Sequence, residues 1–190
     1  MYTLLLAALF GLALAQQQGT NTPEVHPQLP SQSCTRDGGC RTLNTSVVID
    51  SNYRWIHNVG GFDSCNPAGL SPEFCPNVTA CGLNCALEGV DYPSSGITTN
   101  GSSLTLDLFV SGAALSPRVY LLENESEYSL FQLLNKEFTY TIDVSNVPCG
   151  VNGALYFSEM SANGGASEIN TAGAKYGTGY CGTISKIETP

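Results

Sequence analysis

Hydrophobic and polar residues alternate with a period of two in the second half of the chain. Apolar residues occupy every second position from Leu104 to Val110 and from Phe138 to Val144, with threonines and aspartates among the intervening residues. This alternation is typical of strands that bury one face. Apolar-rich segments at residues 118–123, 128–134 and 154–160 are also predicted to be strands.

The first half is richer in loops. Residues 16–32 are polar and aperiodic, which predicts an extended lead-in, and residues 34–85 hold six of the eight cysteines. Two short strands are predicted in this part, at residues 46–50 and 53–57. Turn signals such as Asn100-Gly101 separate the strands, and no stretch has a convincing helical period. Many short strands with polar turns predict an all-β, antiparallel sandwich.

An apolar run from Leu4 to Ala15 ends in Ala-Leu-Ala and is followed by three glutamines. This pattern predicts a secretory signal peptide at residues 1–15. The run is shorter than the roughly 20 apolar residues that a membrane anchor needs. We therefore expect a secreted, extracellular protein without a membrane partner, folded as one domain from Gln16 onwards.

The amino-acid composition limits the classes of ligand that the protein can bind. The net charge is −9 with only seven lysines and arginines, which excludes a nucleic-acid partner because phosphates require a basic surface. Charged residues make up 12% of the chain, so a neutral ligand suits it better. Eight cysteines in an exported chain favour disulfides, and their spacing does not match zinc ribbons. Four Asn-x-Ser/Thr triplets predict N-glycosylation, at Asn44, Asn77, Asn100 and Asn124.

Motifs for catalysis are scarce. His26 and His57 lie near no nucleophile signature, so both are interpreted as structural. Hydrolysis of a glycosidic bond with retention uses two carboxyl groups about 5 Å apart. Glu123, Glu125 and Glu127 alternate, but they surround a glycosylation triplet and are predicted to form a solvated turn. The residues alone therefore predict no acid/base pair.

Aromatic residues give a second signal, because the C–H face of a sugar ring packs on a flat aromatic surface. Tyr53 and Trp55 are two apart on a predicted strand and would present their rings on one face. Tyr156, Tyr176 and Tyr180 follow later in the chain. Core packing is the alternative interpretation for each of these side chains.

Six segments together resemble glycoside hydrolase family 7, the fungal cellobiohydrolases and endoglucanases. The similarity runs from about Gln16 to Cys181, and the stretches at residues 16–20 and 89–92 are closer to endoglucanases. The matching segments are Thr22-Pro-Glu-Val-His-Pro, Ser46-Val-Val-Ile-Asp, Asn52-Tyr-Arg-Trp-Ile-His, Gly89-Val-Asp-Tyr, Pro148-Cys-Gly-Val-Asn-Gly-Ala-Leu-Tyr and Asn170-Thr-Ala-Gly-Ala-Lys-Tyr-Gly-Thr-Gly-Tyr-Cys.

The resemblance implies a concanavalin-like jelly-roll β-sandwich whose concave sheet binds cellulose or another β-1,4-glucan. It implies a monomer without metal or cofactor. The implied disulfides are Cys34–Cys40, Cys65–Cys85 and Cys75–Cys81, whereas the partners of Cys149 and Cys181 would lie beyond Pro190. The implied sugar contacts are Tyr53, Trp55, Arg118, Asn152, Tyr156 and Tyr180.

The chain departs from the family at its end. Family members continue to a Glu-x-Asp-x-x-Glu motif with the nucleophile and the acid/base, and this motif does not occur in the 190 residues. We interpret residues 16–181 as the N-terminal part of a catalytic domain and residues 182–190 as a divergent tail. The expectation is an incomplete sandwich with exposed apolar faces, derived from a retaining β-1,4-glucanase but inactive alone. A non-catalytic glucan-binding protein is the alternative.

Overall fold

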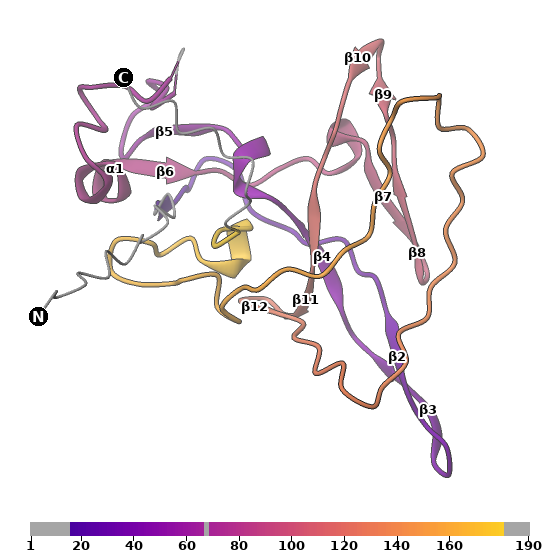
Figure 1. Cartoon of the computed structure of the whole chain (residues 1–190). Helices are drawn as coiled ribbons and strands as arrows, with labels where there is room; N and C mark the ends of the chain where they lie inside the picture. The colour runs from indigo at the N-terminus through magenta and orange to yellow at the C-terminus, as the bar shows by residue number, and fades with distance from the viewer. Residues whose placement is uncertain (1–15, 67–68, 181–190) are drawn as a thin grey trace, which may run out of the picture.

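The computed structural model describes residues 16–66 and 69–180 (Figure 1). The predicted signal peptide at 1–15, Cys181 and the predicted tail at 182–190 lie outside the described residues. Strands predominate, which confirms the all-β class. The strands are β1 (Gln17–Gln18), β2 (Ser31–Thr35), β3 (Gly39–Leu43), β4 (Ser46–Ile49), β5 (Ile56–Asn58), β6 (Cys85–Leu87), β7 (Ile97–Asn100), β8 (Ser103–Leu106), β9 (Phe109–Val110), β10 (Ala113–Ala114), β11 (Val119–Asn124) and β12 (Glu127–Tyr128). The helices are the α-helix α1 (Val78–Asn84) and the 3-10 helices η1 (Ser51–Tyr53), η2 (Pro93–Ser95) and η3 (Ala174–Tyr176).

Strand β4 lies at the centre of the core. It pairs antiparallel with β11, which also pairs with β12. Val47 and Ile49 face one apolar cluster together with Ile97, and Val48 faces a second cluster together with Leu122. Burial on both faces explains why β4 is a continuous apolar run rather than an alternating one. The predictions of strands at these two positions, β4 and β11, are confirmed.

The N-terminal lead-in is extended, as predicted, but it is firmly held. β1 pairs parallel with β6, and β6 pairs antiparallel with β5. The Gly19 amide donates to the Leu87 carbonyl at 2.7 Å, and Gln16 is buried against the C-terminal segment through the Asn170 side chain. The N-terminal segment therefore contacts both the β1-β6-β5 sheet and the C-terminal residues Asn170 and Ala172.

Three hairpins lie on the side of this centre away from α1: β2 with β3, β7 with β8, and β9 with β10 (Figure 1). The single strand predicted from Leu104 to Val110 is divided between β8 and β9. The chain leaves the ladder at Asp107, whose amide donates to the Gly96 carbonyl at 2.8 Å. Leu104 packs on the core, whereas Leu106, two positions later on the same predicted face, is 42% exposed, so the alternation does not reflect one continuous buried face.

Helix α1 was not predicted. It has seven residues, too few to establish a helical period in the sequence. The Asn77 side chain caps it by accepting a hydrogen bond from the Ala80 amide at 2.9 Å, and disulfides at Cys81 and Cys85 hold its end.

Among residues 16–66 and 69–180, neither α1 nor any other helix has the length and apolar character to cross a lipid bilayer.

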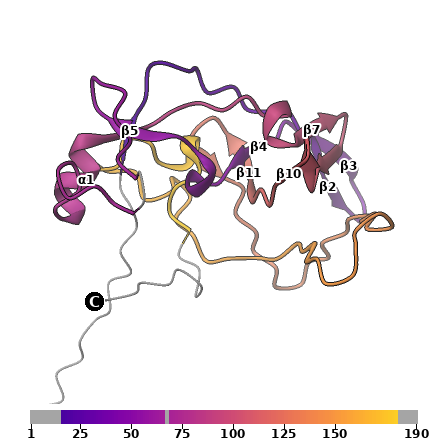
Figure 2. The same ribbon diagram turned by 90° about the horizontal axis from the view of Figure 1, so that it is seen from above.

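The segment from residue 129 to residue 161 corrects three strand predictions. Residues 138–145 and 154–160 form no strand, and the strand predicted at 128–134 is confined to its first residue, in β12. Figure 2 shows this segment as a long trace along one side of the molecule. No strand within the described chain pairs with it, so its backbone lacks the ladder that would make it a sheet. Its apolar rows stay exposed, as expected for an incomplete sandwich, with Ile142 51% exposed.

Candidate functional site

Two exposed aromatic rings stand next to the centre of the fold. Tyr53 and Trp55 are 44% and 43% exposed, and Arg54 between them is buried. They do not share a strand, which corrects the prediction for residues 53–57: Tyr53 ends η1, and β5 begins only at Ile56. The Asp50 carboxylate causes the difference, because it accepts the Asn52 amide at 2.7 Å and turns the chain before the strand can start.

The Trp55 ring is supported from behind. His57 stacks on it with ring centroids 4.3 Å apart and planes 30° from parallel. His57 is in turn held by Glu88, whose Oε1 lies 2.8 Å from Nε2, and by the Asn58 carbonyl at 2.9 Å from Nδ1. Both ring nitrogens thus face acceptors inside the protein. His57 therefore has the structural role predicted for it, and it fixes the orientation of the indole.

Arg54 anchors the same segment in the interior. Its guanidinium forms a bidentate ion pair with Glu24: Nη1 donates to Oε2 at 2.6 Å and Nη2 donates to Oε1 at 2.8 Å. Both side chains are fully buried. Burial would lower the pKa of Arg54, but the hydrogen bond and charge of Glu24 raise it above its ordinary value. The guanidinium also lies over the Tyr176 ring, 5.2 Å from its centroid. This buried ion pair holds Arg54 inside, and Tyr53 and Trp55 on either side of it are exposed.

A second group of side chains surrounds Arg118. Its Nε and Nη2 donate to Asp50 Oδ2 at 2.9 and 2.7 Å, and the Tyr120 hydroxyl donates to the same oxygen. Burial would lower the pKa of Arg118, but these contacts with Asp50 raise it, so the side chain is a fixed cation. No described residue accepts a hydrogen bond from its Nη1. The Arg118 side chain is 28% exposed, so a donor is available to a ligand.

Tyrosines extend the Arg118 group. The Arg118 guanidinium lies 4.0 Å from the centroid of the Tyr180 ring, which supports a cation–π contact. Tyr180 also contacts Tyr156, with centroids 6.5 Å apart, and this neighbouring phenol raises the pKa of Tyr180. Asn152 is exposed, and no hydrogen bond joins it to this group within the described chain. The structure thus brings together three of the six residues implied as sugar contacts: Arg118, Tyr156 and Tyr180.

Sequence reasoning missed Asp50 and Tyr120, the residues that position Arg118. Asp50 is 1% exposed and follows directly on β4, so its carboxylate holds η1 with one oxygen and Arg118 with the other. A charged residue at the end of a continuous apolar strand was the available signal. Through Asp50, the turn that carries Tyr53 is connected to the group around Arg118. A pocket of about 140 Å³ borders Tyr53 on this side, lined partly by the hydroxyl-bearing Ser94, Ser95 and Ser116.

Comparison with known proteins identifies the group to which this arrangement belongs. The model of glycosyl hydrolase family 7 matches residues 18–188. The chain belongs to glycosyl hydrolase family 7. Its relatives in this family include endoglucanase EG-1 of Hypocrea jecorina, 46% identical over 98% of this chain. A probable endo-beta-1,4-glucanase, celB of Aspergillus clavatus, is 52% identical over 92% of this chain. These alignments cover 42% and 43% of the relatives, so the chain spans about two fifths of their length.

Solved family 7 structures agree with the fold. A cellobiohydrolase from Daphnia pulex has a TM-score of 0.80 and 41% identity, covering 87% of this chain and 39% of its own. An endoglucanase I complexed with cellobiose has a TM-score of 0.74 and 36% identity, covering 87% of this chain and 43% of its own. The predicted jelly-roll β-sandwich is therefore the fold of this chain, and the relatives' structures extend well beyond the part aligned with it.

Carboxylates of this family 7 chain do not form an acid/base pair among the described residues. The buried ones are occupied: Asp50 holds Arg118, Glu24 holds Arg54, and Glu88 contacts His57. Glu123, Glu125 and Glu127 are exposed around the turn between β11 and β12, as predicted. None of these groups faces a second free carboxyl group in the way that retaining hydrolysis requires.

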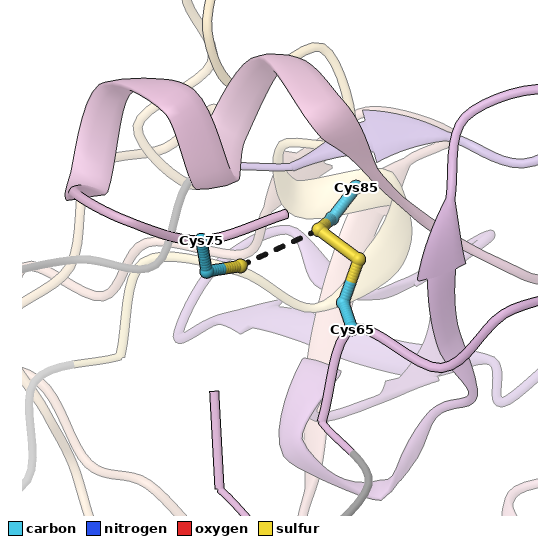
Figure 3. A group of neighbouring side chains, drawn as sticks. All are labelled: Cys65, Cys75 and Cys85. Carbon is cyan, nitrogen blue, oxygen red and sulfur yellow. Dashed lines mark hydrogen bonds between the residues drawn. A yellow bond between two sulfur atoms is a disulfide. The ribbon is translucent and has the colours of Figure 1, made fainter. Parts of the chain in front are cut away.

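Cysteine sulfurs cluster beside α1. The disulfides are Cys34–Cys40, Cys65–Cys85 and Cys75–Cys81, the pairs that the family 7 resemblance implies. Cys75 Sγ also lies 3.5 Å from Cys85 Sγ, so three sulfurs approach each other closely (Figure 3). Metal ions bind thiolates, whereas these sulfurs are all in disulfides. The cluster is therefore two adjacent disulfides and not a metal site. Cys149 is exposed and has no disulfide partner within the described chain.

The four predicted glycosylation sites are all on the surface. The side chains of Asn44, Asn77, Asn100 and Asn124 belong to exposed residues at or next to strand and helix ends. Asn77 caps α1 through its oxygen, so its nitrogen is not needed for the cap.

Proposed function

We propose that this chain provides the glucan-binding portion of a secreted family 7 β-1,4-glucanase and does not hydrolyse glucan by itself. Two features support this: Trp55 is exposed and its ring stacks on His57, and Arg118 is a cation whose Nη1 has no hydrogen-bond acceptor among the described residues. The flat indole suits the C–H face of a glucose ring, and a fixed guanidinium suits its hydroxyl groups. The names of the relatives also support cellulose or another β-1,4-glucan as the ligand.

A pull-down on insoluble cellulose tests the binding. The full chain should sediment with the polysaccharide, and Trp55→Ala should reduce the bound fraction. Phe109→Ala removes an even more exposed aromatic residue from β9, on another hairpin, and serves as the control. Equal sedimentation of the wild-type chain and Trp55→Ala, or none with either, would refute the proposed role.

The absence of hydrolysis rests on the chemistry of the carboxylates. The sequence contains no Glu-x-Asp-x-x-Glu, and the buried carboxylates of the described residues are already bound to arginine or histidine. General acid/base catalysis alone is worth about 100- to 10,000-fold in rate. We therefore expect the purified chain to release no reducing ends from soluble β-glucan above a no-protein blank. Turnover by a homogeneous preparation would contradict the proposal.

A non-catalytic glucan-binding protein is the second candidate, and the free donor on Arg118 favours it equally. The two candidates differ in whether the chain contributes to turnover. If it belongs to a glucanase, adding a fragment that contains the remaining part of a family 7 relative should restore hydrolysis of soluble β-glucan. If binding is its whole function, the mixture should stay inactive while cellulose binding persists.

The remaining parts of the proposal concern processing and assembly. Residues 1–15 are removed on export, the protein acts outside the cell as a monomer, and it uses no metal or cofactor. Mass spectrometry of the secreted product, with light scattering for its molar mass, checks these points. A retained N-terminal segment or a dimer would contradict them.

A further inference from the structure

Phe62 is the most exposed aromatic residue next to the Trp55 ring. Its side chain is 73% exposed, and its ring lies within 18° of parallel to both Trp55 and His57. A single exposed apolar residue is ordinary on a protein surface. Parallel alignment with a supported tryptophan is more specific, because it presents two flat surfaces to the same extended ligand.

The distances fix where the Phe62 ring lies. Its centroid is 6.2 Å from that of Trp55 and 6.5 Å from that of His57, whereas Trp55 and His57 are 4.3 Å apart face to face. A ring stacked on the outer face of Trp55 would be much farther from His57 than from Trp55. Near-equal distances therefore put Phe62 beside the stacked pair. Phe62 therefore does not cover the outer face of the indole, and it widens the aromatic surface sideways.

The loop that carries Phe62 is held by hydrogen bonds at both ends. The Asn58 amide donates to the Asp63 carbonyl at 2.9 Å, and the Asp63 amide donates to Asn58 Oδ1 at 3.0 Å. The Val59 amide donates to the Asn84 carbonyl at 2.7 Å, and the Cys65–Cys85 disulfide follows the loop. Such a loop loses little conformational freedom when a ligand binds, so the exposed ring is preorganised.

We propose that Phe62 forms an additional stacking position for a glucosyl ring next to the one on Trp55, which makes affinity depend on glucan chain length. The inference rests on the proposed glucan-binding function and adds a residue to that site. A flat, apolar ring accepts the C–H face of an unsubstituted pyranose. The ligand class is therefore a linear, undecorated β-1,4-glucan long enough to cover both rings.

Calorimetric titration of the full chain with cellohexaose and cellotriose tests this. Phe62→Ala should weaken cellohexaose binding about three- to tenfold, the range expected for one aromatic stacking contact. It should also abolish most of the difference in affinity between cellohexaose and cellotriose. Phe62→Tyr should bind like the wild-type chain, whereas Phe62→Leu, apolar but not flat, should resemble Phe62→Ala.

The controls separate this inference from the function on which it rests. Trp55→Ala reports on the glucan site itself, and Phe109→Ala reports on the loss of any exposed aromatic ring. Loss of binding in Trp55→Ala together with unchanged binding in Phe62→Ala overturns the role of Phe62 alone. Wild-type affinity in Phe62→Leu also overturns it, because stacking would not be needed. No binding by the wild-type chain overturns both the inference and the proposed function.

Discussion

Replacing Asp50 by asparagine should disrupt the site from within the core. Asp50 is 1% exposed, and its Oδ2 accepts from Arg118 and Tyr120 while its Oδ1 accepts the Asn52 amide. Asparagine has the same shape but only one acceptor oxygen. Whichever way the amide is oriented, its NH2 group faces either the donors of Arg118 and Tyr120 or the backbone amide at the start of η1.

The loss in free energy of unfolding expected for Asp50→Asn lies between the values typical of a buried and of an exposed ion pair. Breaking a fully buried ion pair costs about 3–5 kcal/mol, whereas an exposed pair contributes about 0–1 kcal/mol. Asp50 is buried, but the Arg118 side chain is 28% exposed and can regain some water. We therefore expect Asp50→Asn to lower the free energy of unfolding by about 2–3 kcal/mol.

Urea denaturation followed by far-UV circular dichroism measures this effect. Asp37→Asn, an exposed aspartate in the β2–β3 turn, is the matched control and should change the free energy of unfolding by less than about 0.5 kcal/mol. In an Arg118→Met background, Asp50→Asn should cost less than in the wild-type chain, because the charged partner is already gone. Equal effects of the two asparagine variants, or full additivity with Arg118→Met, would refute the reasoning.

Two further predictions concern the buried charges that support Trp55. Glu24→Gln leaves the Arg54 guanidinium buried without its counter-charge. It should lower the free energy of unfolding in urea titrations by about 3–5 kcal/mol. A loss no larger than that caused by Glu137→Gln, at an exposed glutamate, would contradict this. Burial would raise the pKa of Glu88, but hydrogen bonds from the Thr22 backbone amide and from His57 bring it below its ordinary value of 4.5. The stabilisation by Glu88 is therefore present above about pH 4.5 and is lost as the pH falls through the lower pKa of the folded state. Urea titrations between pH 6 and pH 3 should show a smaller loss of stability in Glu88→Gln than in the wild-type chain, and identical pH profiles would contradict this.

The parts of the fold that the sequence predicted are those set by local patterning and strong burial. β4 and β11 form where an apolar run and its neighbour were expected, because the two strands supply each other's hydrogen bonds. α1 escaped prediction because two helical turns held by a cap and disulfides leave no periodic signal. The alternation at residues 138–145 predicted a half-buried strand, but no described strand pairs with this segment and its apolar side chains are exposed.

The candidate site could be predicted in its surface residues but not in its supports. Tyr53 and Trp55 were anticipated as platforms, yet their relation to each other depends on the turn that Asp50 imposes. His57 was interpreted as structural, but its stacking on Trp55 is a tertiary contact that spacing does not reveal. Phe62 was missed for the same reason, since its alignment with Trp55 depends on how the loop after β5 folds back.

Fluorescence of Trp55 tests the central claim most directly, because it is the single tryptophan of the chain. Titration of the full chain with cellohexaose should change the emission intensity or wavelength in a saturable manner, since a glucose ring would cover the outer face of the indole. Cellohexaose should also protect the fluorescence from quenching by acrylamide, and maltohexaose, an α-linked glucan, should not. Emission and quenching that are unchanged at saturating cellohexaose would contradict glucan binding at Trp55.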